Sequence, residues 1–519
     1  MTQLPASLFI PLSAQSTELA LLSGGDARLA LDHNTNVNKY GCGSHPDPSL
    51  VAFGSSTGST ISERGYHASQ TLHHYLIQQQ AHQPASKARL YRQQLERIRL
   101  ELNHLCGIAP ADNIASIFAA SGTDLHLICA QLTSNSSEKP LRIIMMDGCE
   151  TGSGVAPAVC GQHFSDQATL GGKVTAFKPI DAAHAVEVSS IKLRSDDGSK
   201  RALNDIDIDV NAQIQQALAN KQRVLLIMID VSKTGLIAPS PAYIAHLRTR
   251  YPDQVDILID ACQFRIAPAT INAYLKLGCM LALTGSKFLT GPVFSGALLI
   301  PPNLSARLSN QTLPAAMAAY SAQAEWPQHW QACRQLNDLC NWGLLLRLEA
   351  ALAELKAFRA LSEAQINHFV QQFAETMQQA LRASPHFLLM AESRLDRNPI
   401  VTAPSWDQIP TIFPFILQHA NGQPLSREQT QRIYQQLQFP LEAHADLAPH
   451  IANLRCQLGQ PVLCGQQHGI DVSALRMCAS SRVIIEACQH GEVSAQAVIQ
   501  RALLALEKTA YLIRQELPG

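Results

Sequence analysis

Short apolar runs alternate with amphipathic stretches between residues 115 and 305. Several runs, such as 225–229, are apolar at every position, which is typical of strands that are covered on both faces. Seven runs predict strands, at 141–147, 173–177, 186–193, 223–230, 255–260, 281–285 and 295–300. Helical patterns separate several of these runs, at 208–220, 241–250 and 268–277. This alternation predicts an α/β fold with a doubly wound, mostly parallel, seven-stranded sheet.

The pattern changes on both sides of this region. Residues 65–105 have a helical pattern. After Pro301 and Pro302, apolar spacing and a capping box of Ser426 and Gln429 predict helices at 341–358, at 362–383, from 426 and from about 494. Strand-like runs lie between these helices, at 386–392, 411–418 and 473–479. The C-terminal part is therefore predicted to be a smaller α+β domain.

These patterns divide the chain into three parts. They are an N-terminal arm at 1–52, a large domain at 53–305, and an interdomain helix with a small domain at 306–519. The segment 53–69 is dense in Gly, Ser and Thr. It has two open interpretations, a flexible linker or a border of a partner subunit's active site.

Composition narrows the class of protein. Charged residues make up 16% and apolar residues 46%, which indicates a folded globular chain. The net charge of -1 gives no reason to expect binding to nucleic acid or to an acidic membrane surface. The N-terminus lacks a basic segment followed by an apolar one, and no apolar run approaches the length of a membrane span. The 13 cysteines form no CxxC pair, which favours a reducing cytoplasm.

Polar residues gather at four points where predicted strands end. The first is Ser121-Gly122-Thr123 before a helical run, which suits either a phosphate site or an ordinary N-cap. The second is the turn at 230–235, which contains Ser232. At the third, Asp260 ends a buried strand and needs a cationic or hydrogen-bonding partner, unless it only caps the next turn.

The fourth point is Lys287, which lies between two apolar runs. Thr284 and Ser286 precede it, and the small residues around it leave space. An apolar environment lowers the pKa of a lysine and favours the neutral amine that attacks an aldehyde. Pyridoxal phosphate requires such a lysine, an acid beside its ring nitrogen and an anion site for its phosphate. The four points therefore predict a pyridoxal-phosphate site, with no metal.

The segments Asp-Ala-Cys-Gln at 260–263 and Thr-Gly-Ser-Lys at 284–287, followed by Pro292, carry a family resemblance. The chain resembles the fold type I pyridoxal-phosphate enzymes, in the group of class V aminotransferases and cysteine desulfurases. The resemblance implies a Schiff base at Lys287, an acid partner for the ring nitrogen at Asp260, and a bond from Gln263 to the ring's phenolic oxygen. It implies that the phosphate is held by a polar set, and we assign Ser121, Gly122, Thr123, Thr284, Ser286 and Ser232 to cofactor binding.

Several positions depart from that group. Ser286 replaces the usual histidine before the lysine, and the residue that stacks on the ring is unclear. Glu150 and Thr151 lie near the expected place, and His126 and His163 are alternatives. Lys233 is a rival to Lys287, although its neighbours are more polar.

The candidate residue for substrate binding is Arg476, which interrupts an apolar strand. Such an arginine needs an anionic partner, either a substrate carboxylate or a structural acid. Cys333 and Cys340 are the candidates for the mobile cysteine that a desulfurase needs, but their helical pattern favours packing.

We therefore expect a cytoplasmic, homodimeric enzyme that acts on an amino acid or a related amine. Transamination is the first choice of reaction. The alternative is a lyase, either a C–S lyase or desulfurase or a decarboxylase. A non-catalytic protein with the same fold ranks below both, because Lys287 and Asp260 are present.

Overall fold

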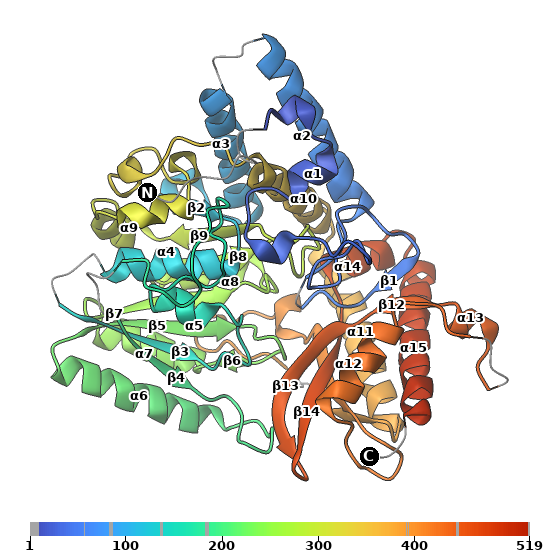
Figure 1. Cartoon of the computed structure of the whole chain (residues 1–519). Coiled ribbons are helices and arrows are strands. Elements are labelled where there is room, and N and C mark those ends of the chain that lie inside the picture. The colour runs from blue at the N-terminus through green and yellow to red at the C-terminus, as the bar shows by residue number, and fades with distance from the viewer. Residues whose placement is uncertain are drawn as a thin grey trace.

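The structure is a computed structural model that describes residues 10–516 except 57, 83–86, 135–138, 182–185, 391, 393 and 443–445. A large sheet occupies one side of the molecule and a smaller sheet the other (Figure 1). The strands of the large sheet fall within residues 115–300, and those of the smaller one within 387–478. The division of the chain at residues 52 and 305 stays a prediction, and part of the arm, residues 1–9, lies outside the described residues.

The large sheet is mostly parallel. Its strand order is β2-β9-β8-β7-β5-β3-β4, and a two-residue strand, β6 (Ile237–Ala238), pairs with β5. Only β9 and β6 run antiparallel to their neighbours. The bounds of the seven main strands are β2 (Ala115–Ala119), β3 (Leu141–Met146), β4 (Glu187–Ile191), β5 (Arg223–Asp230), β7 (Val255–Ala261), β8 (Met280–Thr284) and β9 (Gly296–Ile300).

Six of the seven predicted strands are confirmed, and one is wrong. Residues 173–177 form turns with one isolated bridge, at Lys173. The seventh position belongs to β2, whose five residues are all buried at the edge beside β9. With β6 the sheet has eight strands instead of the predicted seven, and β2 and β6 are the two that the sequence did not predict. The run at 173–177 has a lysine at one end and another directly after it, and no neighbouring strand covers it.

The two faces of the large sheet enter two separate cores. In β3, Ile143 and Met145 pack in one core with α4 (Gly122–Ser134), while Ile144 and Met146 pack in the other. The second core includes residues of α6 (Leu203–Ala219), α7 (Pro241–Arg250) and α8 (Pro268–Lys276). Each fully buried aliphatic side chain contributes about 1.5–3 kcal/mol. Burial on both faces explains why the strands are apolar at nearly every position.

The smaller sheet is antiparallel, in the order β10-β11-β14-β13. Its strands are β10 (Phe387–Leu389), β11 (Ile412–Leu417), β13 (Gly459–Gln467) and β14 (Ile470–Cys478). The helices of this part of the chain are α9 (Pro302–Leu308), α10 (Trp342–Arg359), α11 (Glu363–Ala383), α12 (Arg427–Gln436), α13 (Pro449–Ala452), α14 (Ser481–Cys488) and α15 (Glu492–Gln515). The predicted capping box at Ser426 and Gln429 is confirmed at the start of α12. The hairpin strand β13, with its polar exposed positions, was not predicted.

The N-terminal arm is fastened to the rest of the chain at several places, two of which are its strand β1 and the end of α1. Strand β1 (Leu50–Ala52) pairs in parallel with β12 (Arg455–Gln457). The buried guanidinium of Arg347 in α10 donates hydrogen bonds to the carbonyls of Leu21, Ser23 and Gly24, just after α1 (Thr17–Leu21). Arg347 also donates to the Phe294 carbonyl at 2.6 Å, which links the arm to the loop between β8 and β9.

Two long helices, α2 (Glu63–His82) and α3 (Lys87–Leu105), follow the arm, and both pack against α10 (Figure 1). The predicted helical pattern at 65–105 is thus confirmed, apart from residues 83–86 around Pro84, which lie outside the described residues. Of the helices that the structure describes, none is both long and apolar enough to cross a membrane.

Candidate active site

A cavity of about 280 Å³ lies where several strands of the large sheet end. Parallel strands bring their carboxyl ends to one edge, which is the usual ligand site of an open α/β sheet. Asp260 ends β7, Thr284 ends β8, and Ser121 follows β2. The arm adds Arg28, and β13 adds Gln460. The cavity is therefore built from three parts of the chain that are distant in sequence.

Lys287 lines this cavity together with Asp260. Its loop is anchored by the next residue, Phe288, whose buried ring stacks on Trp406 at 5.5 Å and meets Phe358 of α10 edge-on at 5.2 Å. The sequence suggested that small residues such as Gly285 leave space beside Lys287 for a ligand, but Gly285 has another role in the fold. A Cβ there would lie 2.3 Å from the Cβ of Ala351, so this glycine admits helix α10 rather than a ligand.

Asp260 is held as a carboxylate by its neighbours. Its Oδ2 lies 3.3 Å from Nε2 of His126, and its Oδ1 accepts from the N–H of Cys262 at 3.1 Å. Burial by itself favours the neutral acid. The charges of His126 and Lys287 and these contacts outweigh it and hold the pKa of Asp260 well below its usual range. An ionised, buried carboxylate is the partner that keeps a pyridine nitrogen protonated.

His126 has a role that the sequence did not reveal. The ring is buried in α4, and its Nδ1 lies 2.7 Å from the carbonyl of Gly122. Burial opposes the charged imidazolium, but Asp260 raises the pKa of His126 above its usual value. The ring therefore orients Asp260, and because His126 also lines the cavity, its stacking on a cofactor ring stays an open alternative. His163 contacts the hydroxyl of Tyr320 at 2.5 Å and is not among the described residues that line the cavity.

The N-terminus of α4 forms a cup of hydroxyl and amide groups at the cavity wall. Ser121, Gly122, Thr123, Thr284 and Ser286 all line the cavity. A Cβ on Gly122 would lie 2.9 Å from the Sγ of Cys262, so the tight approach of α4 to β7 requires glycine. The first N–H groups of a helix lack intrahelical partners and favour anions. The predicted phosphate residues are thus brought together.

Arg28 of the N-terminal arm reaches this cup, and no motif signalled it. Its Nη1 lies 3.2 Å from Oγ1 of Thr123, and its Nη2 lies 3.1 Å from Oγ of Ser121. Asp26 orients the guanidinium from behind, with a 2.6 Å ion pair, and the Phe294 ring lies 4.6 Å from it. Burial alone would lower the pKa of Arg28, but its bonds and proximity to Asp26 raise it above the ordinary value. The cup therefore carries a permanent positive charge.

Two predicted cofactor residues lie behind the wall of the cavity rather than on it. Gln263 donates from Nε2 to the carbonyl of Ser56 at 2.9 Å, and its buried Oε1 has no hydrogen-bond partner among the described residues. Ser232 donates to Oε2 of Glu150 at 2.7 Å. Neither residue is among those that line the cavity, so their contact with a cofactor stays a prediction.

Arg476 is fully buried in β14, next to residues that line the cavity. It donates to the carbonyls of Gln460 and Lys233, the latter at 3.5 Å, and its Nε has no partner among the described residues. No ion pair joins it to an acid in the described part of the chain. Burial lowers the pKa of Arg476, although neighbouring groups oppose this. Arg476 itself is not among the described residues that line the cavity, so its contact with a substrate carboxylate stays a prediction.

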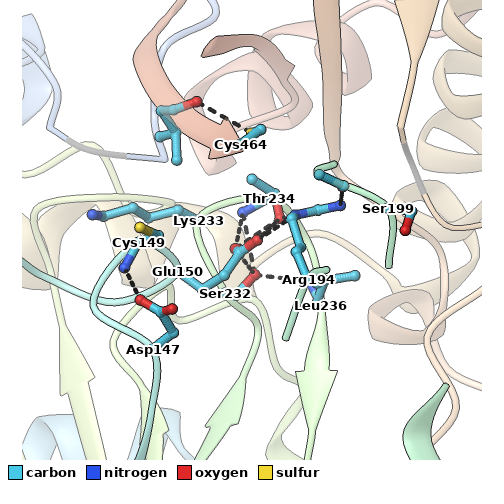
Figure 2. Close-up of polar contacts among 12 residues, drawn as sticks. Asp147, Cys149, Glu150, Arg194, Ser199, Ser232, Lys233, Thr234, Leu236 and Cys464 are labelled. Carbon is cyan, nitrogen blue, oxygen red and sulfur yellow. Dashed lines mark hydrogen bonds and ion pairs between the residues drawn. The ribbon is translucent and has the colours of Figure 1, made fainter. Parts of the chain in front are cut away.

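The rival lysine enters the same cavity. Lys233 follows β5 and is among the residues that line the cavity. Its turn is fixed by Glu150, which accepts from the hydroxyls of Ser232 and Thr234 at 2.7 Å and pairs with Arg194 at 2.8 Å (Figure 2). Glu150 is therefore a buried structural anchor and not a ring-stacking residue.

The loop after β3 contributes small residues. Gly152, Ser153 and Val155 line the cavity where the sequence left the stacking residue open. Thr151 is buried next to them but is not among the lining residues.

The segment 53–69 borders the active site of its own chain. Its first ten residues, 53–62, are buried, apart from residue 57, which lies outside the described residues. Ser59 donates to the carbonyl of Lys287 at 3.4 Å, and Ser56 lines the cavity. The flexible-linker interpretation is therefore wrong.

The cysteines considered for sulfur chemistry lie elsewhere. Cys333 is buried and donates to the carbonyl of Trp330 at 3.2 Å, and Cys340 is half-buried. Neither is among the described residues that line the cavity. Cys262 does line it, but burial raises the pKa of its thiol far above the ordinary value.

These residues fit pyridoxal phosphate. Lys287 supplies an amine, Asp260 an ionised carboxylate, and the cup with Arg28 an anion site. The orphaned Oε1 of Gln263 adds an unused acceptor next to the cavity. Each group that the cofactor requires has a partner of suitable chemistry in one cavity.

No family model and no curated protein matches the chain. Several solved structures resemble it. The cystine C–S lyase C-DES, in complex with its product cysteine persulfide, has a TM-score of 0.53 and 16% identity over 88% of this chain and 98% of its own. A C-DES variant with glycine covalently linked to its PLP cofactor has a TM-score of 0.53 and 15% identity, over 88% and 99%.

The cysteine desulfurase CsdA of Escherichia coli has a TM-score of 0.51 and 14% identity, over 88% of this chain and 95% of its own. Likeness at this level of identity establishes the fold. The chain therefore has the fold type I architecture of these pyridoxal-phosphate-dependent lyases and desulfurases, as its sequence predicted.

Proposed function

We propose that this protein is a pyridoxal-phosphate-dependent enzyme that acts on an amino acid, most simply as a C–S lyase. The observation that carries the proposal is the shared cavity of Lys287, Asp260 with its partner His126, and the Ser121–Thr123 cup. The similar structures include a cystine C–S lyase and a cysteine desulfurase. They favour the lyase alternative over transamination, our first expectation from the sequence.

Pyridoxal phosphate, when bound, supplies an electron sink for the bonds at Cα of an amino acid. Lys287 would hold it covalently and later move a proton at Cα. Asp260, kept ionised by His126, would hold the proton on the ring nitrogen. The cup and Arg28 would bind the phosphate, and Arg476 would bind the substrate carboxylate.

The cysteine inventory favours a lyase that releases its product over a desulfurase that passes sulfur to its own thiolate. Among the described residues that line the cavity, the one cysteine is Cys262. Burial raises the pKa of its thiol, so it is protonated near neutral pH. A thiol is a poor sulfur acceptor compared with a thiolate.

One assay separates a lyase from an aminotransferase. The holoenzyme is incubated with L-cystine, L-cysteine and other amino acids, without any 2-oxo acid. A lyase that eliminates at Cβ releases a 2-oxo acid under these conditions. Release only after an amino acceptor is added would instead establish an aminotransferase, and no product under either condition would contradict the proposal.

We also propose a homodimer in a reducing compartment such as the cytoplasm. All 13 cysteines are free thiols, which supports the compartment. The dimer follows from the family resemblance alone, and sedimentation of the purified holoenzyme tests it.

The first prediction concerns Arg28. We expect Arg28→Gln to weaken binding of pyridoxal phosphate by about ten- to hundredfold, because a charged hydrogen bond to the phosphate is lost. Binding of pyridoxal, which has no phosphate, should not change. The measurement is a titration of the apoprotein with each compound, followed by absorbance.

Two controls accompany this titration. The double variant Asp26→Asn with Arg28→Gln removes the carboxylate that Arg28 would leave unpaired. Arg92→Gln removes a surface arginine that pairs with Asp338. If Arg28→Gln weakens the binding of pyridoxal phosphate and of pyridoxal equally, Arg28 only supports the local fold.

The second prediction concerns Arg476. We expect Arg476→Lys to raise KM for amino acids by about ten- to hundredfold, because an ammonium cannot reproduce a two-pronged bond to a carboxylate. KM for an amine without a carboxylate should change little. Equal losses on both substrates, together with a lower Tm, would show that Arg476 is structural.

A further inference from the structure

A second lysine in the cavity, Lys233, has no assigned task. Its backbone is fixed on one side by the Glu150 anchor, because its N–H donates to the Glu150 carbonyl at 3.1 Å and the N–H of Thr234 donates to the carboxylate at 3.3 Å. The side chain of Lys233 extends away from the Glu150 carboxylate (Figure 2). The turn is thus preorganised, and the ammonium is directed to the cavity that Lys287 lines.

Lys233 has no acidic partner within the described part of the chain. The nearest buried carboxylate, Glu150, is already paired with Arg194 at 2.8 Å and accepts two hydroxyls. Burial, with the charges of Arg476 and Lys287, lowers the pKa of Lys233 to about 8. A half-buried cation in this position is costly for the empty protein. An anion bound beside it would remove that cost.

The cavity is lined by more positively charged side chains than the cofactor and one substrate carboxylate need for pairing. The lining residues include Arg28, Lys39, Lys233 and Lys287, against the single carboxylate of Asp260. Lys287 would be used to bind the cofactor covalently, Asp260 to pair with the ring nitrogen, and Arg28, which already pairs with Asp26, to face the phosphate. Arg476 would then serve the α-carboxylate. Two lysines are left over. The ammonium of Lys39 lies 5.3 Å from the centre of the Tyr40 ring, and Lys233 lies next to Arg476, whose Nη1 contacts the Lys233 carbonyl at 3.5 Å.

We propose that Lys233 binds a second anionic group of the substrate, so that the preferred substrates are amino acids with an acidic side chain, such as a carboxylate or a sulfinate. This inference rests on the proposed function, because the cofactor is needed to place the substrate. A compact ammonium on a fixed turn suits a terminal anionic group. The neighbouring Arg476 sets the distance between the two anionic groups.

The competing role for Lys233 is proton transfer at the reacting carbon. A lysine with a lowered pKa suits that task as well. The two roles differ in what they do to binding. An anion site changes the affinity for dicarboxylates in the absence of turnover, whereas a proton-transfer residue changes kcat for every substrate.

The test uses the holoenzyme with succinate as the dicarboxylate probe and butyrate as its monocarboxylate match. Isothermal titration calorimetry gives the Kd of each for the wild type, for Lys233→Met and for Lys233→Arg. Lys192→Met is the matched control, because Lys192 lies on the surface with 62% of its side chain exposed. Circular dichroism and Tm show that each variant is folded.

We expect the wild type to bind succinate at least about tenfold more tightly than butyrate. Lys233→Met should lose about ten- to hundredfold in succinate affinity and almost nothing for butyrate, the effect of one lost charged contact. Lys233→Arg should keep most of the preference, and Lys192→Met all of it.

Equal affinity of the wild type for the two probes would overturn the inference, as would equal losses in Lys233→Met. A protein that takes up no pyridoxal phosphate would instead refute the proposed function itself. If Lys233→Met fails to fold, the comparison of succinate with butyrate on the wild type and on Lys233→Arg decides the matter.

Discussion

Replacing Lys287 with alanine is expected to abolish turnover and the covalent attachment of cofactor, and to leave the fold intact. The reason is that Lys287 supplies the amine of the site, while its loop is anchored by the neighbouring Phe288 against Trp406 and Phe358. Its backbone carbonyl, which accepts from Ser59 and from the N–H of Thr290, survives the change. Activity and Tm of the purified variant are the measurements.

The matched control is Lys233→Ala, which removes the other lysine of the cavity. That variant should keep its covalent cofactor. If Lys287→Ala retained turnover while Lys233→Ala lost it, Lys233 and not Lys287 would be the lysine that binds the cofactor covalently.

Replacing Asp260 with asparagine should retain the cofactor but slow turnover by about a thousandfold or more. A neutral amide cannot hold a proton on the ring nitrogen. The variant also leaves His126 without the carboxylate that raises its pKa, so the imidazole should become neutral at lower pH. Steady-state kcat, measured beside cofactor content, tests the first effect, and NMR titration of the His126 ring tests the second.

His126→Asn is the companion variant. Because the ring acts through Asp260, its removal should cost less than the loss of Asp260 and should shift the pH profile of kcat toward that of Asp260→Asn. Near-normal kcat in Asp260→Asn would show that this carboxylate only caps the end of β7.

The elements that the sequence predicted best are those whose burial is uniform. Strands β5 and β7 are apolar at most of their positions because the sheet is covered on both faces, and their order along the chain follows from the alternation with helices. The motif residues Lys287 and Asp260 meet because Asp260 lies near the end of β7 and Lys287 follows the neighbouring parallel strand β8. These features depend on local patterns, which a single sequence records.

Other parts of the site depend on tertiary contacts that leave no local pattern. Arg28 reaches the cup only because Arg347, more than 300 positions later, binds the arm's carbonyls. His126 looked like a stacking ring, and its role became visible only when α4 was placed against Asp260. The run at 173–177 failed as a strand because no partner strand lies beside it among the described residues, whereas β2, of the same length, pairs with β9.

Glycines near Lys287 illustrate the same limit. The sequence suggested that small residues leave space for a ligand. In the fold, Gly285 and Gly291 instead admit Ala351 of α10, at distances that a Cβ could not keep. The same residue type therefore serves packing here, and at Gly122 it serves the approach of α4 to the cavity.

The central claim is that this cavity holds pyridoxal phosphate on Lys287, and one measurement tests it most directly. The purified protein is incubated with pyridoxal phosphate, reduced with borohydride, digested and mapped by mass spectrometry. The account predicts one pyridoxyl label, on the peptide that contains Lys287, and none on the peptide that contains Lys233. A label on Lys233, or a protein that carries no specific label at all, would contradict it.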